Sequence, residues 1–262
     1  MRREKSQQSA GAKRDLLKST KAAGTLYLVG VPIGHPDDIT VRALAILSQV
    51  DVVATEDPGA TQTLLQYHNL SVPLTSYGPT KINEKVPVLI HRLLHGSSVA
   101  LLSDCGTPLI SDPGCLLVTA AHQNNIAVRS IPGPSAVTAT IAASGFPAEA
   151  FHFYGEIAIE KHANKRRLLS LLNHAEPTIL FCQTTSCLAI LDGIAAIAPR
   201  RQVALACNLT VQDENVLRGT ARRVASLYRN APRPHTVTII LSGRKDVTSG
   251  RASKLVTRSL LS

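Results

Sequence analysis

Short apolar runs rich in β-branched residues alternate along the chain with longer amphipathic stretches. Four runs in the first half have the pattern of buried strands: Thr25–Val29, Val52–Thr55, Val99–Ser103 and Val128–Ile131. Helical spacing of apolar residues occurs between and after them, over Asp37–Val50 and over residues 60–69, 84–95, 113–124 and 135–144. This alternation predicts a mostly parallel sheet whose binding residues lie in the loops that follow the strands.

The alternation resumes after Gly145-Phe146-Pro147, a turn-forming sequence. Strand patterns follow at Phe151–Tyr154, Thr178–Phe181, Val203–Cys207 and Thr236–Leu241, and helical patterns at residues 161–174, 185–196 and 220–230. We therefore predict an α/β protein of two α/β domains, over residues 22–148 and 149–243, with mostly parallel or mixed sheets. A cleft between two such domains is a common place for a small-molecule site.

Charge is unevenly distributed along the 262 residues, which carry a formal net charge of +10. Residues 1–21 hold seven cations and two acids, and residues 244–262 hold five cations and one acid. The two predicted domains are consequently almost neutral. Both terminal stretches are polar, so we interpret them as mobile basic tails that strengthen binding to a polyanion in a salt-sensitive way.

Membrane and disulfide architectures are not favoured by the sequence. No apolar run approaches the roughly 18 residues of a membrane-spanning helix, and the first residues lack the apolar centre of a secretory signal. The five cysteines are odd in number and lack CxxC spacing, which favours reduced thiols over a disulfide framework or a zinc site. We expect a cytoplasmic protein without a metal.

Three loops after predicted strands carry distinctive residues. Gly30–Pro36 fits neither GxGxxG nor a phosphate-binding P-loop, and by itself indicates an ordinary strand-to-helix turn. In the loop Ser103–Gly114, Asp104 follows the strand directly and is suited to accept hydrogen bonds from ribose hydroxyls or an ammonium group. Asp112 precedes a proline, which predicts a helix N-cap.

The third loop, Ile131–Ala136, also joins a strand to a helix. Ser135 is the expected N-cap of that helix, and its hydroxyl also faces the predicted cleft. The two roles are compatible, because a helix N-terminus beside a ligand is a binding position.

Together these segments resemble the tetrapyrrole methylase superfamily and, within it, the group of ribosomal RNA small subunit methyltransferase I, which methylates a cytidine 2′-hydroxyl of 16S rRNA. The resemblance spans about residues 24–243. Its most specific parts are Gly24–Tyr27, Pro32–Gly34, Asp38–Leu44, Ser103–Gly114 and Ile131–Ala136. It implies two α/β domains with S-adenosylmethionine in the cleft between them, and usually a homodimer.

The resemblance also implies which residues line the methyl-donor site. Carried over by position, these are Pro32, Asp104, Gly106, Thr107, Ser135 and Ala136, with Phe181, Ala206 and Thr236 from the second domain.

Methyl transfer to a ribose hydroxyl needs alignment of the nucleophile with the methyl group, and benefits from a proton acceptor because a hydroxyl is a weak nucleophile. Glu56 and Asp57 follow a predicted strand directly, and Glu84 lies in Asn83-Glu84-Lys85. These three carboxylates are the candidate catalytic residues. Each of them also fits a solvated loop carboxylate or a helix cap.

The chain departs from the pattern of that group on the acceptor side. Pro58-Gly59 stands where Thr-Arg is usual, Ile82 stands where His is usual, and small neutral residues occupy Cys182–Leu188 and Ala206–Thr210. One interpretation keeps 16S rRNA, or the small ribosomal subunit, as the partner, contacted by Lys161, Lys165, Arg166, Arg167 and the Arg218–Arg233 group. The alternatives are an inactive donor-binding or ribosome-associated homologue, and a methylase of a small tetrapyrrole-type acceptor.

Overall fold

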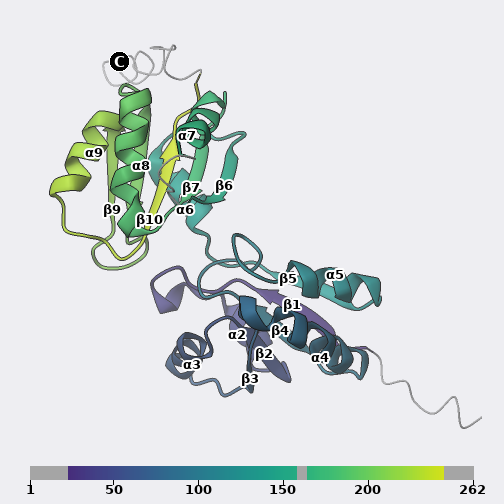
Figure 1. Cartoon of the computed structure of the whole chain (residues 1–262). Helices are drawn as coiled ribbons and strands as arrows, with labels where there is room; N and C mark the ends of the chain where they lie inside the picture. Colours follow the sequence, from purple (N-terminus) through teal and green to yellow (C-terminus); the bar gives the residue numbers. More distant parts are fainter. Residues whose placement is uncertain (1–22, 158–163, 245–262) are drawn as a thin grey trace, which may run out of the picture. The chain divides into compact units, whose positions relative to one another are not determined.

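The computed structural model describes residues 23–157 and 164–244, which form two compact α/β units (Figure 1). The first unit runs from residue 23 to Val31 and from Ile39 to Gly133. The second unit takes Pro32–Asp38 and the described residues from Pro134 onwards. The chain therefore passes between the units three times, and two of these passages border the short segment Pro32–Asp38.

The first unit is built on a five-stranded parallel sheet in the order β3-β2-β4-β1-β5. Its strands are β1 (Thr25–Val29), β2 (Val52–Thr55), β3 (Leu74–Ser76), β4 (Val99–Leu102) and β5 (Ala127–Ile131). The α-helices of this unit are α2 (Val41–Leu47), α3 (Pro58–Tyr67), α4 (Ile82–Leu94) and α5 (Cys115–Gln123), joined by the 3-10 turns η1 (Pro36–Asp38, assigned to the second unit) and η2 (Pro79–Lys81).

Both faces of this sheet are buried, because successive strand residues point to opposite sides. In β4, Val99 and Leu101 join a core with Leu89 and Leu93 of α4. On the other face, Ala100 and Leu102 of the same strand share a core with Ala43 and Leu47 of α2 and with Leu65 of α3. The continuous apolar strands of the sequence thus reflect a sheet covered by helices on both sides.

The second unit has a mixed five-stranded sheet in the order β6-β7-β10-β8-β9. Its strands are β6 (His152–Glu156), β7 (Thr178–Phe181), β8 (Gln202–Cys207), β9 (Asn215–Thr220) and β10 (Val237–Leu241), and its helices are α6 (Ala136–Ser144), α7 (Asn164–Asn173), α8 (Thr184–Ile197) and α9 (Ala221–Asn230). Strand β10 is antiparallel to both of its neighbours. This confirms the prediction of an α/β fold with mostly parallel or mixed sheets.

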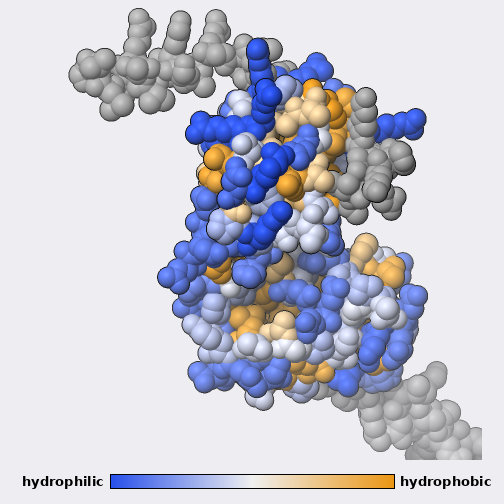
Figure 2. Space-filling model, turned by 60° about the vertical axis from the view of Figure 1, so that its left-hand side comes forward, coloured by the Kyte–Doolittle hydropathy of each residue, from blue (hydrophilic) through white to orange (hydrophobic). Residues whose placement is uncertain are grey.

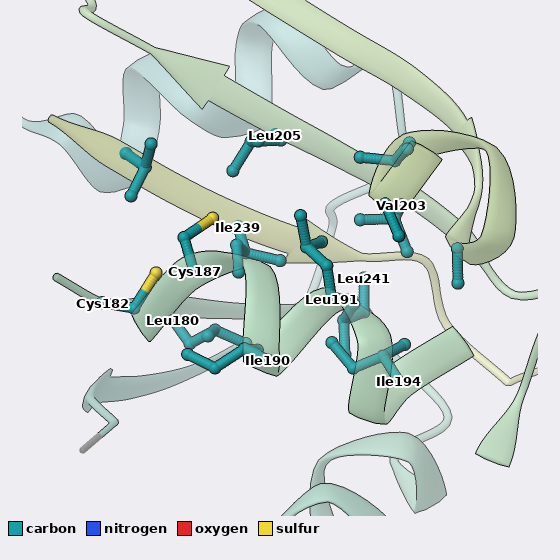
Figure 3. Packing of buried hydrophobic residues seen from close by; sticks show 14 of the residues in the cluster. Leu180, Cys182, Cys187, Ile190, Leu191, Ile194, Val203, Leu205, Ile239 and Leu241 are labelled. Atoms are coloured by element: carbon teal, nitrogen blue, oxygen red, sulfur yellow. The ribbon is translucent and has the colours of Figure 1, made fainter. Parts of the chain in front are cut away.

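One large core lies between this sheet and the helices α7, α8 and α9. Figure 3 shows its centre, where Ile190, Leu191 and Ile194 of α8 lie against Leu180 and Ile239 of the sheet. Cys182 and Cys187 lie at the edge of the same core and share a hydrogen bond. In agreement with the expectation from sequence, the described cysteines are free thiols.

Helix α6 covers the opposite face of the second sheet, where Val137 and Ile141 pack with Ile179, Ala204 and Ile240. For this reason the boundary after the first unit falls between Gly133 and Pro134, whereas the sequence pattern placed it at 148/149. The apolar face of α6 matches either sheet by hydrophobicity alone, so only the packing decides its unit.

Several local elements also differ from the expectation. The helix expected over Asp37–Val50 is shorter: Pro36–Asp38 forms a 3-10 turn, and Thr40 caps α2 by accepting the N–H of Ala43 at 3.1 Å. The strands β3 and β9 were not predicted. β3 has only three residues and β9 contains Arg218 and Gly219, so neither shows the apolar run of a buried strand.

The expected basic tails lie outside the described residues, except for Arg244. Within the described ranges, no helix has the length and apolar character that crossing a membrane requires.

The loops after β1 and β5 cross in direct backbone contact at Gly30 and Gly133. A Cβ at Gly133 would lie 2.7 Å from the carbonyl carbon and oxygen of Gly30, and a Cβ at Gly30 would lie 2.8 Å from the backbone of Gly133. Backbone atoms cannot move aside as a flexible side chain can, so both positions require glycine.

Gly133→Ala should therefore lower the free energy of unfolding by about 1–3 kcal/mol, the usual cost of overpacking. Urea denaturation followed by circular dichroism would measure the loss. Gly78→Ala is the matched control, because the nearest atoms to its added Cβ lie at 3.8 and 3.9 Å. Equal losses in the two variants would contradict the close approach.

Candidate functional site

The loops with distinctive sequence gather at the carboxyl end of the first sheet. Strands β1 and β4 are neighbours, but the chain continues from β1 to β2 and from β4 to β5, which lie in opposite directions across the sheet. Such a reversal leaves space outside the strand ends and is the usual position of a ligand site in open α/β sheets.

Backbone hydrogen bonds connect these loops. The N–H of Val31 donates to the carbonyl of Gly106 at 2.8 Å, and the N–H of Gly106 returns a bond of 3.2 Å to Val31. The buried hydroxyl of Ser103 lies 3.2 Å from the carbonyl oxygens of both Cys105 and Gly106. The predicted donor residue Gly106 is thus buried in the loop framework, and its φ of 75° explains the glycine.

The remainder of the Ser103–Gly114 loop is conformationally unusual. Leu109 and Ser111 have φ angles of 72° and 68°, which side-chain-bearing residues seldom adopt. Thr107, a predicted donor residue, precedes them and is partly exposed. Strained backbone of this kind persists only where surrounding contacts fix it, and such positions cluster at functional sites.

Asp104 connects the ends of β4 and β2. One of its carboxylate oxygens accepts the N–H of Asp57 at 3.0 Å, while the residue as a whole is exposed. Asp57 in turn caps α3, because its Oδ1 accepts the N–H groups of Gly59 and Ala60 at 2.8 and 3.1 Å. Of the two interpretations of Asp57, the structure therefore shows a helix cap.

Glu56 and Asp112 form an acidic group with Asp104. Burial, followed by the charges of Glu56 and Asp104, raises the pKa of Asp112 to about 6, against a smaller lowering by a hydrogen bond from Ser103. Burial and then the charge of Asp104 also raise the pKa of Glu56. A carboxyl group with a pKa near 6 is suited to accept a proton at neutral pH.

One expectation about the acids needs correction. Asp112 is not a helix cap, because α5 begins at Cys115 with Gly114 at the N-cap position. The Asp-Pro pair was a misleading signal, since the positive φ angles of Ser111 and Gly114 interrupt the helix there. Glu84 lies in the first turn of α4, largely exposed, and its carboxylate pairs with Lys85 at 3.8 Å.

In the second unit, the expected donor residues meet at one edge of the sheet. Thr238 of β10 pairs in register with both Phe181 at the end of β7 and Ala206 near the end of β8. Thr236 lies just before β10 at the same edge. Ala206 is 1% exposed, so its contribution to a site is limited to close packing and its backbone.

Asn208 organises this edge through its side chain. The sequence analysis included it only in the stretch Ala206–Thr210 and did not predict a role for it. Its Oδ1 accepts the N–H groups of His235 and Thr236 at 2.8 and 3.1 Å, and its amide donates to Asp213 at 2.5 Å. Asn208 itself has a φ of 50°. An asparagine after a strand was the only available signal, because Asn tolerates this conformation better than most residues.

The segment Pro32–Asp38 belongs to this second unit. The N–H of His35 donates to the hydroxyl of Thr210 at 2.9 Å. Gly34 lies against the same loop, where an added Cβ would come within 2.6 Å of the Leu209 carbonyl oxygen. Pro32, a predicted donor residue, is buried at the start of the segment.

Helix α6 begins at the third loop, but not as expected. Ser135 occupies the N-cap position, yet its side chain makes no capping hydrogen bond. The prediction that the Ser135 hydroxyl caps this helix is therefore wrong. The first N–H groups of α6, beginning at Ala136, consequently lack a side-chain cap at a helix end that favours negative charge.

The predicted RNA-binding cations are only partly described. Lys161 lies outside the described residues, and of Lys165 only the helical backbone is described. Arg166 and Arg167 are exposed near the start of α7. Among the described residues, no group of three or more His, Cys, Asp or Glu side chains is arranged to hold a metal ion.

Residues 25–225 match the family described as Tetrapyrrole (Corrin/Porphyrin) Methylases. The chain belongs to this family. Among its relatives is a protein named ribosomal RNA small subunit methyltransferase I from Thermotoga maritima, 35% identical over 223 residues, with 85% of this chain and 100% of that protein covered. The protein of the same name from Micromonospora olivasterospora is 39% identical over 208 residues, which cover 79% of this chain and 66% of its own length.

A solved structure of similar fold supports the architecture. It is the uroporphyrin-III C-methyltransferase of Thermus thermophilus in complex with S-adenosylhomocysteine, with a TM-score of 0.58 and 18% identity, covering 86% of this chain and 100% of that one.

The residues of this tetrapyrrole methylase fit the chemistry of S-adenosylmethionine. Its ribose hydroxyls and ammonium group need acceptors, which Asp104 and its acidic neighbours provide at the first sheet. Its carboxylate needs donors, which the uncapped start of α6 provides at the second.

Asp112→Asn tests the electrostatics of the acidic group. Because the folded-state pKa of Asp112 is raised from 3.8 to about 6, the folded state binds more protons, and its stability falls as pH rises through this interval. The variant should therefore be more stable than the parent by about 1–2 kcal/mol at pH 7–8, allowing for solvent screening. The difference should vanish below about pH 4.

Urea unfolding at several pH values would measure the effect. Glu84→Gln is the control at an exposed carboxylate. It should leave the change in the free energy of unfolding between neutral and acid pH as it is in the parent protein. A destabilised Asp112→Asn at neutral pH would show that the carboxylate makes stabilising contacts instead.

Proposed function

We propose that this chain is an S-adenosylmethionine-dependent methyltransferase that modifies 16S rRNA, with a cytidine ribose 2′-hydroxyl as the acceptor. The observation that carries the proposal is the sequence identity of 35–39% to proteins named ribosomal RNA small subunit methyltransferase I, in one case over that protein's whole length. The loops at the two sheet edges supply the groups that a methyl donor and a proton transfer require.

In this proposal, Asp104 and the loop residues Gly106 and Thr107 bind the methyl donor in the first unit. Pro32, Ser135, Ala136, Phe181, Ala206 and Thr236 bind it in the second. S-adenosylmethionine, when bound, supplies an electrophilic methyl group. The chain's own task is to orient the acceptor hydroxyl and to exclude competing water.

Asp112 and Glu56 are the groups that we assign to proton transfer. An ionised carboxylate of Asp112 takes the proton of the ribose hydroxyl onto an Oδ atom while the oxygen bonds to the methyl carbon and the bond from that carbon to the donor's sulfur breaks. The raised pKa brings the basicity of Asp112 closer to the operating pH. Asp57 is left out, because its carboxylate caps α3, and so is Glu84, whose carboxylate pairs with Lys85.

The proposal includes a small-ribosomal-subunit partner, a cytoplasmic location and a homodimer. Several residues that are usual on the acceptor side are absent, so the experiment must also distinguish two alternative functions. These are a donor-binding homologue without activity and a methylase of a small tetrapyrrole-type acceptor.

The decisive experiment incubates the full chain with radiolabelled S-adenosylmethionine and small ribosomal subunits from a strain that lacks the modification. Label should appear in 16S rRNA at one cytidine. The RNA backbone should resist alkaline cleavage after that cytidine, because a methylated 2′-oxygen cannot attack the neighbouring phosphate. Donor binding without transfer would indicate the inactive homologue. Transfer to a tetrapyrrole and not to RNA would indicate the small-molecule methylase.

Asp104→Ala should weaken donor binding about tenfold or more, because a ligand hydrogen bond to a charged group is lost. Isothermal titration calorimetry measures it, and thermal unfolding checks that loss of the bond to Asp57 leaves the fold intact. Asp51→Asn is the control. Asp51 also accepts a backbone N–H, from Ser98, but it precedes β2 and therefore lies at the opposite end of the sheet from Asp104. Unchanged affinity in Asp104→Ala would remove Asp104 from the donor site.

A further inference from the structure

Arg233 lies at the edge of the second sheet where Phe181, Ala206 and Thr236 meet. It belongs to the loop between α9 and β10, and β10 begins only four residues later, where Val237 pairs with Cys207. In Figure 1 this loop and the one that joins β8 to β9 run along the same side of the unit. The Arg233 side chain is exposed there.

The backbone of this loop is held in place on both sides of Arg233. Pro232 and Pro234 flank it and fix their own φ angles. The next two N–H groups, of His235 and Thr236, both donate to the buried Asn208 side chain. Arg233 is therefore exposed on a restrained backbone.

Its guanidinium is positioned as well. The guanidinium carbon lies 5.5 Å from the centre of the Tyr228 ring, within the range of a cation–π contact. Tyr228 is 1% exposed, and its hydroxyl donates to the Thr184 carbonyl at 3.3 Å. Because the ring is fixed, the guanidinium has lost part of its rotational freedom before any ligand binds.

Within the described part of the chain, no carboxylate forms an ion pair with Arg233, whose guanidinium hydrogen-bonds to the Tyr228 side chain instead. Its neighbours at this edge are engaged elsewhere: Asp213 accepts from Asn208, and Glu214 accepts the N–H of Thr210. Arg229 provides the contrast, since its guanidinium pairs with Asp192 at 2.7 Å.

The surroundings favour a polyanion. The stretch Asn215–Val237 contains five arginines and no acid. Figure 2 shows strongly hydrophilic side chains gathered over the second unit, on the side that carries α9. An arginine fork matches the paired oxygens of a phosphate and binds them with geometric selectivity.

We propose that Arg233 is a binding residue for the RNA acceptor and holds a backbone phosphate beside the Phe181–Ala206–Thr236 edge. This inference rests on the proposed function, which makes RNA the substrate. A phosphate fixed at this edge would set the position of the ribose next to it, so that Arg233 contributes to binding and leaves the proton-transfer groups unaffected.

The test compares Arg233→Gln with Arg229→Gln in methyl transfer to small ribosomal subunits. Both variants remove one positive charge from neighbouring exposed positions, but only Arg233 is free of a carboxylate partner. Arg233→Gln should raise the KM for the particle roughly tenfold, leave the donor KM unchanged and reduce the slope of log affinity against log salt by about 1. Arg229→Gln should change the slope by much less.

Two further variants separate phosphate binding from a purely structural role. Arg233→Lys keeps the charge and should retain most of the salt slope while losing part of the affinity, because lysine lacks the planar fork. Tyr228→Phe keeps the ring beneath the guanidinium but removes the hydroxyl to which Arg233 hydrogen-bonds, so it should raise the KM for the particle by less than Arg233→Gln does. Thermal unfolding of all variants shows whether any of them fails to fold.

The outcomes are distinguishable. An active parent protein with an unchanged KM and salt slope in Arg233→Gln would overturn this inference and leave the proposed function standing. Equal effects of Arg229→Gln and Arg233→Gln would overturn it too, since a diffuse charge effect would then suffice. A parent protein that neither binds nor methylates the particle would overturn both.

Discussion

Backbone-to-backbone contact between the loops of the first unit is the constraint on which its candidate site depends. The reciprocal bonds between Val31 and Gly106 and the close approach of Gly30 and Gly133 bind the loops after β1, β4 and β5 into one framework. Contacts of this kind leave no room for side chains, which accounts for the glycines. They also fix the loop that presents Asp104, Thr107 and Asp112 at the carboxyl end of the sheet.

Electrostatics give the two sheet edges different characters. At the first, burial raises the pKa values of Glu56 and Asp112, and the negative charge of Asp104 raises both of them further. At the second, the Asn208 side chain fixes the backbone of the loop that carries Arg233, and the guanidinium lies over the Tyr228 ring. An acidic edge suits hydroxyl and ammonium groups and proton transfer, whereas an exposed guanidinium suits a phosphate.

The family relationship and the local geometry carry different parts of the functional argument. Identity to named relatives supports a methyltransferase and its RNA substrate, but the small residues at Cys182–Leu188 and Ala206–Thr210 leave the acceptor side without several usual functional groups. Two of these small residues, Cys182 and Cys187, are buried in the core behind the second edge. Arg233, in the loop that precedes β10, would supply the phosphate-binding cation from a different element of the same unit.

The sequence by itself determined the α/β class, most strands and helices, and the loops at which Asp104, Gly106 and Thr107 lie. Periodicity and glycine positions are local signals, so they could be read without the fold. Only the tertiary structure decided that α6 and Pro32–Asp38 belong to the second unit, that Asp57 caps a helix whereas Asp112 does not, and that Arg233 lies over Tyr228. Each of these depends on packing or hydrogen bonding between residues distant in sequence, or on loop φ angles that the fold imposes, and neither leaves a periodic pattern in the chain.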